Sequence, residues 1–324
     1  MKSARFRLGS VLIAIALAAF AAAAFSACNE KETAPPAVDG ELALKYAQEN
    51  YDLGPKIFRT EGAAKSAEWI EKQAIEMPGF LESGGRVGIV DAGAVKNVEI
   101  IIPPIVRNTA QKADDGDFIV IGAHHDTKRL FSVPDFAGAN DGASGVGALL
   151  AMARACVEHM QTRSLPCSIR FVFFDGEEAL YQYTETDGLV GSRAYVAGLR
   201  QSGDMERCRA MILLDMIGDK DLHIDLAGNS TPALAKVVVS EAAAAGYADK
   251  FSRGETPMLD DHYPFLQAGI PAVDLIDFDY GPKNSYWHTG ADTMDKISAE
   301  SIKTAADVAL RVVWRLAENG FKDL

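Results

Sequence analysis

The sequence is poor in cysteine and in basic residues, and it has only one long apolar run. Its 324 residues contain four cysteines, none of them in a Cys-x-x-Cys pair, which argues against a cysteine zinc site. If Cys28 is modified, the remaining Cys156, Cys167 and Cys208 allow at most one disulfide. With 45 acidic against 32 basic residues and a formal charge of −13, the chain is not expected to bind nucleic acid.

The one long apolar run lies near the amino terminus. Residues 11–25 follow a short basic start and are too few for a comfortable membrane span, a pattern typical of a bacterial export signal over residues 1–27. Ala24-Phe25-Ser26-Ala27-Cys28 resembles a lipobox, with Phe25 where Leu is usual. We therefore expect a cell-envelope lipoprotein, on the periplasmic or outer-surface side and anchored to the membrane through an acylated Cys28. Plain secretion is the alternative.

The rest of the chain is predicted to form a tether and one domain. Residues 28–40 include Pro35-Pro36 and show no hydrophobic periodicity, so we interpret them as the lipoprotein tether. Residues 41–324 are long enough for one large core and show neither a second boundary nor an internal repeat. We expect this domain to be a monomer.

Apolar strand patterns alternate with helical patterns along the domain. The expected strands are Arg86–Val90, Val98–Ile102, Asp117–Ala123, Ser168–Phe174, Arg209–Leu214, Leu222–Leu226 and Ile270–Ile276. The expected helices are Glu41–Gln48, Ala63–Glu76, Val146–Glu158, Leu189–Leu199, Pro232–Ala245 and Ser298–Glu318. This alternation predicts a three-layer α/β/α fold, in which a mostly parallel central sheet is covered by helices on both faces.

Polar residues follow three of the strongest strands at the point where each strand ends. These residues are His124-His125-Asp126, Glu177-Glu178 and Asp215. In open α/β sheets, catalytic groups gather where the strands run out. A single His or Asp in such a place is more often a buried or turn-forming residue. Because several occur together, with Asp141 and Trp287-His288 elsewhere in the chain, they predict one shared site.

The segment Phe171–Glu178 is an apolar run that ends abruptly in three carboxylates. Alone, its Glu-Glu pair would more often be a solvated turn. Side chains at neighbouring positions point in different directions, so one glutamate could bind a metal while the other moves protons. Carboxylates and imidazoles without thiolates suit Zn²⁺ with an open coordination position, which indicates a catalytic metal site.

Several segments resemble the zinc-dependent aminopeptidase superfamily. They are Gly122–Asp126, Gly138–Gly145, Phe174–Glu178, Leu214–Met216 and Trp287–Thr289. Further segments look more like the glutaminyl cyclases (glutaminyl-peptide cyclotransferases) of that superfamily, namely Asp126–Lys128, Glu177–Ala179 with Asp187–Arg193, and Asp260–Leu266. The resemblance covers nearly all of the chain after Gly40 and implies a zinc exopeptidase-like fold.

The resemblance also implies roles for single residues. Asp141, Glu178 and His288 match the ligands of the zinc that both branches share. Glu177 matches the general acid/base. This ligand set does not separate the two branches.

A second set of implied roles concerns the residues around this zinc. His124 and Asp215 match the ligands of a second zinc in two-metal aminopeptidases, and cyclases keep equivalent residues without filling that site. Asp126 is expected to orient the His124 imidazole. Asp215 and Asp261 match cyclase carboxylates that form a hydrogen-bonded network beside the substrate amine, a catalytic role.

The substrate pocket and two further histidines complete the expectations. Trp287 matches an aromatic residue of the cyclase pocket, and Tyr183 stands where animal cyclases have Trp. His125 is expected to be structural, because residue alternation points it away from the site. Asp260 and Asp261 precede His262 at an expected helix start. Capping of that helix by one of these aspartates is therefore an alternative to the catalytic role of Asp261.

The sequence thus favours a zinc-dependent glutaminyl-peptide cyclotransferase, an acyltransferase with one zinc that acts on the amino termini of peptides and proteins. It would convert N-terminal glutamine to pyroglutamate and release ammonia. The alternative is a two-zinc aminopeptidase that hydrolyses N-terminal residues from peptides on the same scaffold. A third hypothesis is an inactive envelope binding protein that keeps the fold, which the complete ligand set disfavours.

Overall fold

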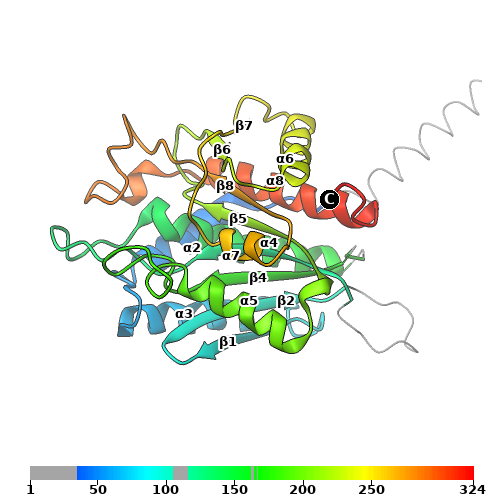
Figure 1. Ribbon diagram of the computed structural model, residues 1–324, viewed down its shortest axis with the longest axis horizontal. Coiled ribbons are helices and arrows are strands. Elements are labelled where there is room, and N and C mark those ends of the chain that lie inside the picture. Colours follow the sequence, from blue (N-terminus) through cyan, green and yellow to red (C-terminus); the bar gives the residue numbers. More distant parts are fainter. Residues whose placement is uncertain (1–34, 105–115, 162–163, 166) are drawn as a thin grey trace, which may run out of the picture. The chain divides into compact units, whose positions relative to one another are not determined.

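The fold is built around an eight-stranded sheet (Figure 1), seen in a computed structural model that describes residues 35–104, 116–161, 164–165 and 167–324. The predicted signal peptide, Cys28 and most of the tether lie outside the described residues. Residues 36–324 form one unit, and no helix in the described part of the chain is long and apolar enough to cross a membrane. Cys156, Cys167 and Cys208 are buried and free.

The central strands of the sheet are parallel and its margins are not. The strands are β1 (Arg86–Ala92), β2 (Val95–Ile102), β3 (Phe118–His124), β4 (Ser168–Phe174), β5 (Cys208–Asp215), β6 (Ile224–Leu226), β7 (Phe251–Arg253) and β8 (Ala272–Ile276). Their order is β1-β2-β4-β3-β5-β8-β6-β7. Strands β4, β3, β5 and β8 run parallel, whereas β1 with β2, β2 with β4, and β8 with β6 are antiparallel. The parallel centre brings the carboxyl ends of β3, β4 and β5 to one edge.

Helices cover both faces of the sheet, as the sequence predicted. One face carries α2 (Gly40–Tyr51), α3 (Glu61–Ile75), α4 (Gly145–Met160), α6 (Pro232–Ala244) and α8 (Ala299–Glu318). The other face carries α5 (Val190–Ser202) and α7 (Tyr263–Gln267). Three short turns, η1 (Ala139–Ser144), η2 (Met205–Arg207) and η3 (Met294–Lys296), complete the order of elements.

Strand β4 shows why two layers of helices are needed. Its residues Ile169, Phe171 and Phe173 pack into the larger cluster of buried side chains, and the alternate residues Val172 and Phe174 pack into the smaller one. Successive side chains of a strand point to opposite faces, so a strand that is apolar throughout must be covered on both sides. The expected strands and helices occur within a few residues of their predicted bounds; β7, with three residues, was not predicted.

We expect the core around Phe171 to dominate stability. Its side chain is fully buried, so Phe171→Ala should lower the free energy of unfolding by about 3–5 kcal/mol through lost burial and the cavity left behind. Phe131 is 75% exposed, and Phe131→Ala should change the value by less than about 0.5 kcal/mol. Urea denaturation of both variants measures the difference, and equal stabilities would contradict this description of the core.

Candidate metal centre and catalytic site

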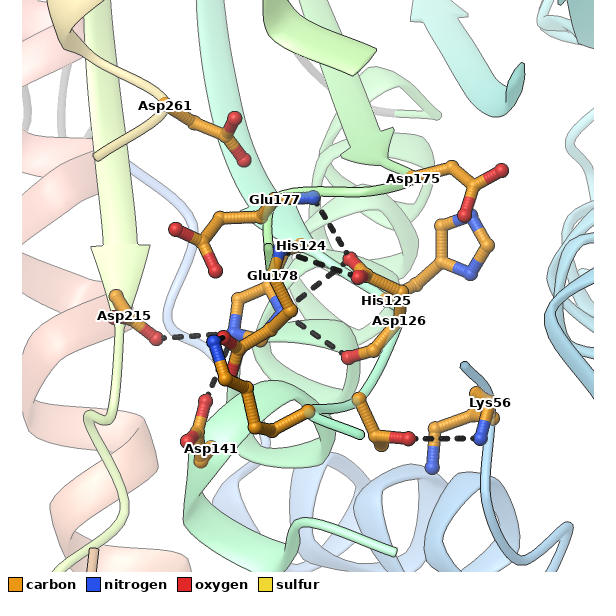
Figure 2. Close-up of polar contacts among 12 residues, drawn as sticks. Lys56, His124, His125, Asp126, Asp141, Asp175, Glu177, Glu178, Asp215 and Asp261 are labelled. Carbon is orange, nitrogen blue, oxygen red and sulfur yellow. Dashed lines mark hydrogen bonds and ion pairs between the residues drawn. The ribbon is translucent and has the colours of Figure 1, made fainter. Parts of the chain in front are cut away.

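The polar residues predicted at three strand ends lie together at one edge of the sheet (Figure 2). His124 is the last residue of β3, Glu177 and Glu178 follow β4, and Asp215 ends β5. These strands are parallel neighbours, so their carboxyl ends meet. Asp141 joins them from η1, and its carboxylate lies between the imidazoles of His124 and His288.

Asp126 fixes the backbone on which the two glutamates stand. Its buried carboxylate accepts hydrogen bonds from the amides of Glu177 (3.1 Å) and Glu178 (3.2 Å). The backbone carbonyl of Asp126 lies 3.1 Å from His124 Nδ1, whereas its carboxylate lies 3.7 Å from that atom. The carbonyl is therefore the nearer partner of His124, and the carboxylate, expected to orient that ring, also holds the turn after β4.

Three side chains form the first candidate metal centre. His288 Nε2 lies 2.8 Å from Glu178 Oε1 and 3.2 Å from Asp141 Oδ2, and the carboxylates are almost fully buried. Ligand atoms around a four-coordinate zinc lie about 3.3 Å apart, because each is about 2.0–2.1 Å from the ion. The separations and the N/O donor set both fit zinc.

The second group shares Asp141 with the first. His124 Nε2 lies 3.2 Å from Asp141 Oδ1 and 3.3 Å from Asp215 Oδ1. In the described part of the chain, His124 Nε2 and Asp215 Oδ1 are buried without a hydrogen-bond partner. Buried polar atoms are rarely left unpaired, so this arrangement also suits a cation. Asp141 thus presents one oxygen to each group of ligands.

A kink in the chain aims Asp141 at the site. The turn η1 departs from helical geometry at Asp141 and at Gly142, whose φ is 107°. A Cβ at Gly142 would lie 3.3 Å from His124 Cε1, so the close approach favours glycine. Asp292 accepts hydrogen bonds from the amides of Asn140 (2.8 Å) and Asp141 (3.2 Å). Neither Asn140 nor Asp292 was predicted from the sequence. Asn140 lies in the Gly138–Gly145 segment, whereas Asp292 has no local sequence signal.

His288 adopts a backbone conformation that is rare for its residue type. Its φ is 52°, in the left-handed region that costs free energy outside glycine. The ring of Trp287 stacks on the imidazole with centroids 4.0 Å apart, and Phe136 meets it edge-on at 6.3 Å. Trp287, predicted to line the pocket, therefore packs directly on a candidate ligand.

The two adjacent glutamates have different partners. Tyr183, predicted to lie in the pocket, donates a hydrogen bond from its hydroxyl to Glu177 Oε1 at 2.9 Å. Lys128 Nζ lies 3.0 Å from Glu178 Oε2. Burial and the neighbouring Glu178 carboxylate raise the pKa of Glu177 well above its usual range. Lys128 lies in the Asp126–Lys128 segment, but the sequence predicted no role for it.

Of the two carboxylates expected to bind the substrate amine, Asp261 lies close enough to Glu177 for their charges to interact. Burial raises the pKa of Asp261 to about 7, and the Glu177 and Asp261 carboxylates repel each other. Among the described residues, no hydrogen bond joins Asp261 to Asp215. Helix α7 begins after His262 without a side-chain cap, so the capping alternative is wrong.

His125 and Lys56 lie beside the site and support its backbone. His125 Nε2 lies 3.1 Å from the Lys96 carbonyl, and burial lowers its pKa to about 4, which confirms a structural position away from the metal centre. Lys56 (Figure 2) is fully buried, which lowers its pKa to about 7. It donates to the Ala137 carbonyl at 2.8 Å and so holds the segment that leads to Asp141.

The chain resembles known proteins over most of its length. Residues 105–313, more than half of the chain, match Peptidase family M28. A glutaminyl cyclase from an Acidobacteriales bacterium is 31% identical, with a TM-score of 0.75 over 89% of this chain and 97% of that one. A leucine aminopeptidase precursor from Bacteroides thetaiotaomicron is 25% identical, with a TM-score of 0.69 over 86% and 98% of the two chains.

Two curated relatives represent the same two activities. Glutaminyl-peptide cyclotransferase of Drosophila melanogaster is 27% identical over 201 residues, which are 56% of each protein. Aminopeptidase YwaD of Bacillus subtilis is 30% identical over 61% of this chain and 41% of that protein. The chain therefore spans about half the length of the curated relatives it matches. The chain belongs to peptidase family M28, on the branch that includes the bacterial glutaminyl cyclases.

Proposed function

We propose that the protein is a zinc-dependent glutaminyl-peptide cyclotransferase, which converts the N-terminal glutamine of peptides to pyroglutamate with release of ammonia. The observation that carries this proposal is the similarity to the Acidobacteriales glutaminyl cyclase across 97% of that chain. The stretches Ala179–Arg193 and Asp260–Leu266 support it, because each contributes a residue that interacts with Glu177. Tyr183 bonds to the Glu177 carboxylate, and Asp261 interacts with it electrostatically.

We infer that one zinc ion is held by Asp141, Glu178 and His288. When bound, zinc supplies a Lewis acid that polarises the γ-carboxamide carbonyl of the substrate. The remaining chemistry belongs to the protein and the peptide. Asp261 is a fully buried acidic group and Asp215 a mostly buried one, with a side chain 12% exposed, and both are suited to orient the α-amine. The aromatic ring of Trp287 lies next to His288 as a wall for the glutamine side chain.

Glu177 is placed to carry the proton that cyclisation must move. The neutral α-amine attacks the γ-carbonyl carbon; a carbon–nitrogen bond forms, the bond to the amide nitrogen breaks, and ammonia leaves. Glu177 takes a proton from the attacking amine and gives it to the leaving nitrogen. Burial raises the pKa of Glu177, which moves it toward the range where a carboxylate both accepts and returns a proton. An α-amine titrates at about 8, so its neutral form is accessible.

The second candidate function is a two-zinc aminopeptidase. The observation that favours it is that Asp141 presents Oδ1 to His124 and Oδ2 to His288, each at 3.2 Å, so that both groups of ligands would share this carboxylate if two zinc ions were bound. In that reaction, a water molecule attacks the first peptide carbonyl carbon and gives a proton to Glu177. A carbon–oxygen bond forms, the carbon–nitrogen bond breaks, and Glu177 returns the proton to the leaving amine. The scaffold serves both reactions, so the products decide between them.

The first prediction concerns those products. A peptide with N-terminal Gln should release ammonia and keep its chain length, and one with N-terminal Leu should stay intact. Mass spectrometry and an ammonia assay measure both. Glu177→Gln should lower kcat by about 10²- to 10⁴-fold, because the proton carrier is lost. Loss of the first residue from either peptide would overturn the cyclase proposal, and an undiminished rate in Glu177→Gln would remove Glu177 from the mechanism.

The second prediction concerns metal content. Elemental analysis should find one zinc per chain, lost in His288→Ala and kept in His223→Ala, whose imidazole is 52% exposed. Two tightly held zincs per chain would favour the aminopeptidase.

The third prediction is that zinc binds more tightly as the pH rises. Burial favours the neutral ring of His288, but its hydrogen bonds to Asp141 and Glu178 outweigh this and raise its pKa to about 9. Below that pH, zinc must displace a proton from His288. Affinity should therefore rise from pH 6 to 8 and flatten above about 9. Competition with a chelator at several pH values measures it, and a constant affinity would contradict the protonation of His288.

We also propose that the protein is exported and anchored through an acylated Cys28. Cells fed radioactive palmitate should label the wild-type chain in the membrane fraction, because the lipobox-like segment ends at this residue. Cys28→Ser should abolish the label, whereas Cys208→Ser, which alters a buried cysteine, should keep it. Label that survives Cys28→Ser would rule out this anchor.

A further inference from the structure

The hydroxyl of Tyr183 is the one hydrogen-bond partner that the described residues offer to the Glu177 carboxylate. The Tyr183 hydroxyl donates to Glu177 Oε1 at 2.9 Å. The tyrosine is 40% exposed, whereas Glu177 is 7% exposed. The phenol therefore reaches from the surface into the buried site and ends on the group proposed to carry the proton. A hydrogen bond to a carboxylate is stronger than one between neutral groups.

The Asp187 carboxylate holds the loop that carries Tyr183 through several hydrogen bonds. Asp187 accepts hydrogen bonds from the amides of Leu180 (2.6 Å), Tyr181 (2.9 Å) and Gln182 (3.2 Å). Its carbonyl accepts a further bond from the Thr184 amide at 2.8 Å. These hydrogen bonds involve residues that precede and follow Tyr183 in the chain. The loop backbone therefore fixes the position of Tyr183.

Gly188 gives the tyrosine ring the room to lie beside the site. A Cβ at Gly188 would lie 2.3 Å from Tyr183 Cδ1, far inside contact distance, and its φ is 82°. The next amide, of Leu189, donates to the Glu177 carbonyl at 2.9 Å. The end of the loop thus bonds to the backbone of Glu177, and Tyr183 in the same loop bonds to the side chain of Glu177.

Lys128 completes the division between the two glutamates. Its Nζ lies 3.0 Å from Glu178 Oε2 and 5.3 Å from the centre of the Tyr183 ring. The ammonium therefore pairs with the proposed zinc ligand, and the phenol pairs with the proposed proton carrier. Each of the adjacent carboxylates has a partner of its own.

We propose that Tyr183 is a positioning residue, whose hydroxyl holds the Glu177 carboxylate in the orientation that transfers the proton. The Ala179–Gly188 loop serves to hold Tyr183 there. This inference rests on the proposed role of Glu177, which is the same in cyclisation and in hydrolysis. A carboxylate that must meet both an attacking and a leaving group gains rate when its orientation is fixed beforehand.

The kinetic test compares two tyrosines of the same loop. Tyr183→Phe removes only the hydroxyl and should lower kcat about tenfold, the effect of losing one hydrogen bond to a charged group. KM should stay within about twofold, because the ring remains. Tyr181 is 78% exposed, and Tyr181→Phe should change neither constant. A Tyr183→Phe enzyme with unchanged kcat, or with only a raised KM, would overturn the proposal and leave Tyr183 as part of the pocket wall.

A second readout does not depend on activity. In crystal structures of the metal-free protein, Glu177 should occupy one orientation in the wild type and more than one in Tyr183→Phe. A single unchanged orientation in the variant would overturn the proposal. The kinetic comparison uses whichever peptide the wild type converts, Gln-peptide by cyclisation or Leu-peptide by hydrolysis. Failure of the cyclase proposal is therefore seen in the wild-type products, and failure of the positioning role is seen in the variant.

Discussion

The site depends on the hydrogen bonds between the Asp126 carboxylate and the amides of Glu177 and Glu178. These bonds join the end of β3 to the turn after β4 and set the direction in which each glutamate leaves the backbone. Because Asp126 is fully buried, it needs hydrogen-bond donors in place of water, and these two amides supply them. The same residue uses its carbonyl for His124, so one side chain and its backbone align groups from two strands.

From this turn, two neighbouring residues acquire separate chemistry. Glu178 faces His288 and Lys128, which are cationic or metal-binding groups, and Glu177 faces the neutral phenol of Tyr183. Burial raises the pKa of Glu177, and repulsion from Glu178 adds to that effect. A metal ligand must stay ionised and a proton carrier must gain and lose a proton, so the different surroundings match the two proposed roles.

The sequence predicted what local patterns encode. Strands that alternate with helices run parallel, so the sequence predicted the direction of the central strands. The apolar runs that end in His124, Glu177 and Asp215 then indicated the edge of the sheet at which these residues meet. The support of Asp141 by Asp292 joins residues about 150 positions apart and leaves no periodic signal. The hydrogen bond from the Tyr183 hydroxyl to Glu177 could likewise not be predicted, because it depends on the conformation of the loop and not on its composition.

The central claim is that Asp141, Glu178 and His288 together hold the catalytic zinc, and that Glu177 lies beside the zinc without binding it. Anomalous diffraction recorded at the zinc absorption edge, from crystals of the zinc-loaded protein, tests this directly. A strong peak is expected within about 2.0–2.2 Å of one atom from each of the three ligands, with Glu177 outside the coordination sphere. A peak bound to Glu177, or no peak between these three side chains, would contradict it.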